Sequence, residues 1–161
     1  MTPQTNRIDV TLDTALDSVG LAEEMSLRVA SSAGFGDEEC HRIGMSVREG
    51  VINAFHYGNS ERRDKKIRLA FELTPEKMVI HVLDEGEGFN LADVPDPLAE
   101  ENLLKMSGRG IFLMRAFMDE FEVARGPQGG AEIIMAKRFP DRGTVSPNVA
   151  TAKRRATRKE K

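Results

Sequence analysis

An apolar strand pattern runs without a break into an acidic, glycine-rich segment at residues 78–89, which read MVIHVLDEGEGF. Residues 78–83 are apolar apart from one histidine, which predicts a strand. Asp84 follows at its end, with Gly86 and Gly88 directly after it. A carboxylate acceptor beside glycine backbone, which can approach a ligand closely, favours a binding edge over a hairpin turn, because a turn would not need the acid.

Two helices are predicted upstream of this strand. The first begins at an N-cap formed by Asp13 or Thr14 and runs to about residue 31. The second begins at an Asp37 cap and ends near Gly58-Asn59, where a left-handed C-cap is expected. Each has an apolar stripe: Leu21, Met25 and Val29 in the first, and Ile43, Val47, Val51 and Phe55 in the second.

Five strands and a third helix complete the pattern. The strands are expected at residues 7–12, 67–73, 78–83, 121–124 and 132–137, with a turn at 74–77 and the third helix at 111–118. This order predicts an α+β fold, a two-layer sandwich in which a mainly antiparallel sheet is covered on one face by three helices. Periodicity is lost over residues 85–110, and loops of this length inside a domain are usually functional or mobile.

Composition bounds the class of protein. The 161 residues are 40% apolar and 30% charged, which is typical of one globular domain, and no apolar run approaches the roughly 20 residues of a membrane span. We expect a domain at residues 1–140 and a flexible basic tail at 141–161. The single cysteine, Cys40, excludes an internal disulfide, and the N-terminus lacks a secretory pattern, so a cytoplasmic protein is predicted.

The charge is divided unevenly along the chain. Residues 144–161 carry a net charge of +5, so the preceding body carries −8 of the total of −3. An acidic body argues against direct nucleic-acid binding, and the basic tail alone could contact an anionic partner.

Glu49 and Asn53 stand four residues apart on the second helix and therefore on one line. That line is nearly opposite Val47 and Val51, so the pattern taken alone predicts solvated side chains on an outer face. The acid and glycines that follow the strand at 78–83 favour a functional interpretation of the same pair.

A second glycine-rich segment, Ser107-Gly108-Arg109-Gly110, leads directly into the third helix. Glycines before a helix expose unpaired backbone amides at the positive end of the helix dipole, which suits a phosphate group. Alone this is a weak signal, because many helices start after glycine. The three elements in this order are far more specific.

These residues resemble the N, G1 and G2 boxes of the GHKL ATPases, the superfamily of gyrase, the histidine kinases and MutL. The matching segments are Glu49-x-x-x-Asn53-Ala54 with Asn59, Asp84-x-Gly86-x-Gly88-Phe89, and Gly108-x-Gly110. Residues 108–114 (GRGIFLM), with Met118-Asp119-Glu120, resemble the anti-sigma-factor serine kinases more narrowly. The resemblance covers about residues 8–139, and the lack of a preceding phosphoacceptor helix pair disfavours a full histidine kinase.

The resemblance implies the Bergerat ATP-binding fold and a role for each matching residue. Asn53 would bind a Mg²⁺ that bridges the ATP phosphates, and Glu49 would be the general base. Asp84 would accept a hydrogen bond from the adenine amino group, and residues 90–107 would form a nucleotide-dependent lid. The backbone contacts would come from Gly86 and Gly88 at the base, and from Gly108, Arg109 and Gly110 at the phosphates.

Three positions depart from the pattern of that superfamily. Ala131 follows Gly130 where a threonine is common, which removes one polar contact to nucleotide. Lys105 is the nearest basic residue before the second glycine box, and we predict a binding role for it. Tyr57 stands where related sequences often have histidine, and both a contact with the base or ribose and a purely structural role stay open.

The resemblance implies an ATP-dependent serine/threonine-protein kinase that is also an anti-sigma factor. It would hold a sigma factor in one state and phosphorylate a small anti-anti-sigma partner of the STAS type in the other, as a homodimer that uses ATP and Mg²⁺. One alternative is an ATP/ADP-gated binding module without phosphotransfer. Another is a sensor-kinase ATPase domain whose phosphoacceptor lies on another chain.

Overall fold

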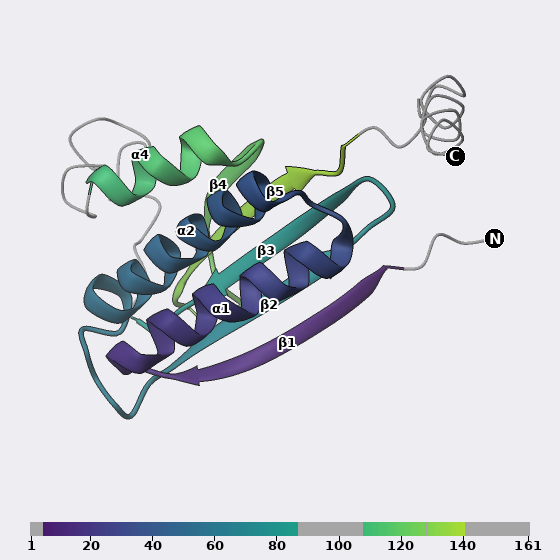
Figure 1. The fold of residues 1–161 in the computed structure, drawn as a ribbon. Coiled ribbons are helices and arrows are strands. Elements are labelled where there is room, and N and C mark those ends of the chain that lie inside the picture. Colours follow the sequence, from purple (N-terminus) through teal and green to yellow (C-terminus); the bar gives the residue numbers. More distant parts are fainter. Residues whose placement is uncertain (1–4, 87–107, 128, 141–161) are drawn as a thin grey trace, which may run out of the picture.

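The computed structural model describes residues 5–86, 108–127 and 129–140. Within these ranges, three α-helices cover one face of a five-stranded sheet whose order is β1-β2-β3-β5-β4 (Figure 1). Every neighbouring pair of strands is antiparallel, so the predicted α+β sandwich is confirmed. The elements are β1 (Asn6–Asp13), α1 (Leu16–Ala33), α2 (Asp37–Asn53), the π-helix η1 (Ala54–Gly58), β2 (Lys66–Leu73), β3 (Lys77–Leu83), α4 (Gly108–Phe117), β4 (Glu120–Arg125) and β5 (Ala131–Arg138).

One cross-strand row shows how the sheet meets the helices. Phe71 of β2 lies opposite Ile80 of β3, which lies opposite Met135 of β5, and none of the three is more than 1% exposed. Ile8 of the edge strand β1 continues the same row but is 43% exposed. The apolar core therefore lies between the helices and the three central strands.

An Ile80→Val substitution tests this core. Removal of one buried methyl group at a site with no exposed surface should lower the free energy of unfolding by about 0.5–1.5 kcal/mol, measured by urea denaturation. Ile8→Val is the matched control and should stay within about 0.5 kcal/mol of the wild-type protein. Equal losses at both positions would contradict the assignment of the core.

Helix α2 lies between α1 and α4 (Figure 1). Its predicted apolar stripe is confirmed: Ile43, Val47 and Val51 are fully buried, and Phe55 in the following turn is 6% exposed. Because α2 has a helix on each flank and the sheet beneath it, a wide arc of its surface is buried.

The predicted caps of α1 are wrong. The helix follows Ala15, and no side chain caps it. Thr14 Oγ1 instead donates to the carbonyl oxygen of Lys65 at 2.6 Å, and the carboxylate of Asp13 pairs with Lys66. Both side chains therefore tie the end of β1 to the start of β2.

The apolar stripe of α1 is also displaced from the prediction. Leu21 is 49% exposed, whereas Met25 and Val29 are only partly buried. The buried residues are Ser18, Val19, Ala22, Ser26 and Ala30. The two helices approach closely at Gly44 of α2, where an added Cβ would come within 2.9 Å of Leu27 of α1.

The ends of α2 differ in detail from the prediction. Asp37 is its first residue rather than its cap, and no side chain caps the helix. Helical backbone continues through η1 to Gly58, as predicted, but Asn59 has a φ of −89°, so the left-handed C-cap is wrong. Left-handed backbone follows at Ser60 (φ 50°) and Glu61 (φ 58°) instead.

No helix in the described ranges is long and apolar enough to cross a bilayer. The predicted lid at 90–107 and the predicted tail at 141–161 lie outside the described residues.

Candidate nucleotide-binding site

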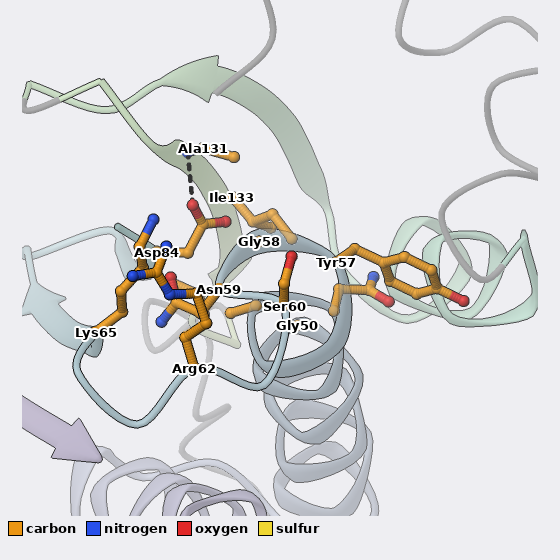
Figure 2. Close-up of a pocket in the computed structure, with 13 residues that line it drawn as sticks. Gly50, Tyr57, Gly58, Asn59, Ser60, Arg62, Lys65, Asp84, Ala131 and Ile133 are labelled. Carbon is orange, nitrogen blue, oxygen red and sulfur yellow. Dashed lines mark hydrogen bonds between the residues drawn. The ribbon is translucent and has the colours of Figure 1, made fainter. Parts of the chain in front are cut away.

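A cavity of about 440 Å³ opens where α2 and η1 meet the ends of β3 and β5 (Figure 2). Asn53 and Tyr57 line it from the helix, and Asp84 and Ala131 line it from the strand ends. Arg62 and Lys65 line it from the loop after η1, together with Ser60. The sequence had placed three of these residues, Asn53, Tyr57 and Asp84, in one site.

Asn53 is a buried polar residue that lines this cavity. It is 3% exposed, and neither atom of its amide has a hydrogen-bond partner among the described residues. The expectation from helix periodicity alone, a solvated residue on an outer face, is wrong. Asn53 lies on the same flank as Ser46 and Gly50, which faces both the sheet and α4: a Cβ added at Gly50 would meet Val82 Cγ2 at 3.4 Å and Met114 Sδ at 3.7 Å. An orphaned buried amide is costly, and such a group points to a ligand.

Asp84 presents one oxygen to the cavity and uses the other to hold the backbone. Its Oδ1 accepts hydrogen bonds from the N–H of Gly86 at 2.9 Å and of Ala131 at 3.0 Å. Its Oδ2 has no protein donor among the described residues. Burial raises the pKa of Asp84 above its ordinary value, and the two N–H donors and the charge of Lys65 oppose that rise.

Three glycines surround this carboxylate and make room for it. A Cβ at Gly58 would stand 2.1 Å from Asp84 Oδ2, and a Cβ at Gly130 would stand 2.0 Å from the Asp84 carbonyl oxygen. A Cβ at Gly86 would stand 2.2 Å from the Gly58 carbonyl oxygen. Chain segments distant in sequence approach here more closely than any side chain would allow.

A Gly58→Ala substitution should therefore displace Asp84. We expect a loss of about 1–3 kcal/mol in the free energy of unfolding, measured by urea denaturation, because the obstructing atoms include the carboxyl carbon and Cβ. Gly20→Ala is the matched control: nothing lies within 4 Å of its added Cβ, and it sits inside α1. That variant should gain about 0.5–1 kcal/mol. A Gly58→Ala protein as stable as Gly20→Ala would refute the packing described above.

Asn59 holds the loop that lines the cavity in place through side-chain hydrogen bonds. Its Nδ2 donates to Thr14 Oγ1 at 2.8 Å and to the Lys66 carbonyl oxygen at 3.0 Å, while its Oδ1 accepts from the N–H of Glu85 at 2.8 Å. The residue is 1% exposed and its hydrogen-bonding capacity is largely used. It therefore joins the ends of β1 and β3 to the start of β2.

None of the remaining predicted site residues that the structure describes lines the cavity. Glu49 lies one helical turn before Asn53. It is half-buried, has no hydrogen-bond or ion-pair partner among the described residues, and does not line the cavity itself. Gly108, Arg109 and Gly110 form the first turn of α4, which packs on α2. Gly88 and Lys105 lie outside the described residues.

Sequence reasoning did not find the loop residues of the cavity. These residues, Ser60, Arg62 and Lys65, lie in a polar segment without periodicity. No helical or strand pattern therefore predicted that they line the cavity. In the sequence, Gly58 is interpreted as a helix end only, whereas Asn59 is also part of the segment around Asn53 that resembles the N box. The signal that could have found them is their position directly after the conspicuous Asn53 segment.

Comparisons with known proteins agree with this geometry. The histidine kinase-like ATPase domain family matches residues 12–137. The chain belongs to this family. Every site residue discussed above lies inside the span that matches the histidine kinase-like ATPase domain, so the resemblance inferred from the sequence is confirmed.

Similar proteins within this family carry related names. An anti-sigma F factor from Clostridium beijerinckii is 29% identical over 104 residues, which are 63% of this chain and 73% of that protein. A serine-protein kinase RsbW from Oceanobacillus iheyensis is 27% identical over 125 residues, which are 74% of this chain and 78% of that protein.

A solved structure confirms the fold. The RsbU and RsbW domains of a Mycobacterium tuberculosis protein match 84% of this chain with a TM-score of 0.60 and 16% sequence identity. This chain spans only 33% of that longer chain, so the likeness concerns the fold of one part of it.

Proposed function

We propose that this protein is an ATP-dependent protein-serine kinase that also acts as an anti-sigma factor. The observation that carries the proposal is the buried, unpartnered amide of Asn53, which lies in one cavity with Asp84 and one helical turn from Glu49. The names of the similar proteins, anti-sigma F factor and serine-protein kinase RsbW, support it.

The residues present fit a magnesium nucleotide. Mg²⁺ prefers oxygen ligands and keeps several waters, so a single orphaned amide oxygen at Asn53 is a suitable protein ligand. The described residues contain no cluster of three or more acidic, histidine or cysteine side chains for a metal, which agrees with an ion held largely by water and phosphate. Asp84 Oδ2 would accept a hydrogen bond from the adenine amino group.

Bound ATP would supply a γ-phosphoryl group: a bond forms to the partner's serine oxygen, the bond to the β-phosphate oxygen breaks, and ADP leaves. Glu49 would take the proton of that serine hydroxyl. The first turn of α4, with Gly108, Arg109 and Gly110, would donate backbone amides to phosphates. The proposal also includes the predicted contacts with nucleotide of Gly88, Lys105 and Tyr57.

The proposed substrate is a serine on a STAS-type anti-anti-sigma protein, and the proposed second partner is a sigma factor. We also propose a homodimer, a cytoplasmic location and a domain that ends near residue 140. The test is incubation with Mg·ATP labelled at the γ-phosphate and STAS-type proteins encoded in the same genome. Acid-stable phosphoserine on one of them supports the kinase, whereas acid-labile phosphohistidine would assign a sensor-kinase ATPase domain.

One observation favours a second candidate, a nucleotide-gated binding module without phosphotransfer. Glu49 does not line the cavity that holds Asn53. Under this alternative, partner binding changes with ATP or ADP but no partner becomes phosphorylated. The same assay separates the two, provided that a partner is captured in a nucleotide-dependent manner.

A further inference from the structure

Two cationic side chains, Arg62 and Lys65, line the cavity near Asp84 (Figure 2). Among the described residues, only Arg62 has a carboxylate partner. Arg62 donates from Nε and Nη2 to the carboxylate of Asp64 at 3.2 and 2.9 Å. The ammonium of Lys65 is half-buried and forms no ion pair with any described residue. Its charge nevertheless acts on Asp84 across the cavity.

The backbone that carries Lys65 is held firmly. Thr14 Oγ1 donates to its carbonyl oxygen at 2.6 Å, and its own N–H donates to the Arg62 carbonyl oxygen at 3.2 Å. Ser60 and Glu61, earlier in the same loop, both adopt the left-handed region, which costs energy for residues with a side chain. The two hydrogen bonds at Lys65 hold the point from which its side chain leaves the backbone.

Asp84 offers a ligand a single acceptor. Two backbone N–H groups occupy Oδ1, so Oδ2 alone remains. The edge of guanine presents two adjacent N–H donors and needs both carboxylate oxygens. Adenine presents one amino group, flanked by ring nitrogens that accept hydrogen bonds.

We propose that Lys65 reads the nucleobase, by donating a hydrogen bond to the ring nitrogen, N1 or N7, beside the adenine amino group that Asp84 Oδ2 accepts. This inference rests on the proposed function and adds base specificity to the same cavity. The Asp84–Lys65 pair is an acceptor beside a donor, which matches the adenine edge. It opposes guanine in the same pose, because the O6 oxygen of guanine would face a carboxylate.

Calorimetric titration of the whole chain with Mg·ATP, Mg·1-deaza-ATP and Mg·7-deaza-ATP tests the proposal. Lys65→Met should bind ATP about tenfold more weakly than the wild type, which is the effect expected of one hydrogen bond from a charged donor. Lys65→Gln, whose amide still donates, should recover part of the loss. Lys66→Met is the matched control, because Lys66 pairs with Asp13 at the surface and does not line the cavity; its affinity should change less than twofold.

The deaza nucleotides identify the contact. One of the two deaza nucleotides should bind the wild-type protein about tenfold more weakly than ATP binds it. The same nucleotide should bind Lys65→Met no more weakly than ATP binds that variant. The proposal would be overturned if Lys65→Met bound ATP as tightly as the wild type, or if Lys65→Met and Lys66→Met lost equal ATP affinity. It would also be overturned if both deaza nucleotides bound Lys65→Met more weakly than ATP does. Absence of ATP binding by the wild-type protein is a separate result, which would reject the proposed function instead. Thermal unfolding of each variant without nucleotide confirms that it is folded.

Discussion

An Asp84→Asn variant is expected to lose ATP binding without losing stability. Its Oδ1 can still accept the N–H groups of Gly86 and Ala131, so the strand ends stay joined. At the other position an NH₂ group replaces the free carboxylate oxygen and faces the adenine amino group, donor against donor. Loss of a charge-assisted hydrogen bond and creation of an unsatisfied donor should together cost about 3–6 kcal/mol, or roughly a hundredfold to ten-thousandfold in the dissociation constant.

The stability of this variant follows from the pKa of Asp84. Burial raises that pKa in the folded state, so the folded carboxyl holds its proton more tightly than the unfolded one. The stabilising contribution of protonated Asp84 is therefore lost as the pH rises from the ordinary pKa through the raised one. At pH 7 the ionised carboxylate opposes folding. Asp84→Asn should be at least as stable as wild type at pH 7, with any advantage vanishing below the ordinary pKa.

Urea denaturation at pH 7 and pH 3.5 checks the predicted stability of Asp84→Asn, and ATP titration checks its predicted loss of binding. Asp9→Asn is the control, because Asp9 is an exposed partner of Arg7 on β1 and neither residue lines the cavity, so its ATP affinity should be unchanged. An Asp84→Asn protein that binds ATP like wild type would place the base elsewhere. One that is strongly destabilised at pH 7 would contradict the role given to burial.

A Glu49→Gln substitution should lower phosphotransfer by about a hundredfold to ten-thousandfold, which is the usual contribution of a general base. ATP affinity should stay within a few-fold, because Glu49 neither lines the cavity nor holds another described residue. The measurement is the initial rate of phosphoserine formation on the partner at saturating Mg·ATP.

The matched control is Glu38→Gln at the other end of α2, where the side chain is 79% exposed and pairs with Arg42. Its rate should equal that of the wild type. Unchanged phosphotransfer in Glu49→Gln would remove the catalytic role from this residue. Loss of ATP binding in the same variant would show that Glu49 belongs to the nucleotide site rather than to the proton transfer.

Periodicity predicted the sheet and the helices because each buries one regular face. The period of two over residues 67–73 and the period near four from Ile43 to Phe55 both describe side chains that pack on the same core. The helix caps failed for a different reason. Asp13 and Thr14 have cap-forming side chains, but partners distant in sequence, Lys66 and Lys65, compete for them.

A cavity residue was predictable from the sequence only where its residue type was unusual for its position in a helix or strand. Asp84 at a strand end met that condition. The burial of Asn53 depends on tertiary packing, because a Cβ added at Gly50 on the same flank would meet Val82 of β3 and Met114 of α4, both distant in sequence. The close approach of Gly58, Gly86 and Gly130 to Asp84 is a property of three chain segments together. No local pattern in any one segment records it.

Thermal unfolding with and without Mg·ATP tests the central claim, a magnesium-dependent nucleotide site at Asn53 and Asp84, most directly. Ligand at 100 times its dissociation constant adds about 2.7 kcal/mol to the free energy of unfolding. For a domain of this size, that corresponds to a rise of roughly 5–10 °C in Tm. We expect this rise in the wild type, and we expect Asn53→Ala to lose its magnesium-dependent part. An unchanged Tm at millimolar Mg·ATP, or an equal rise in Asn53→Ala, would contradict the account.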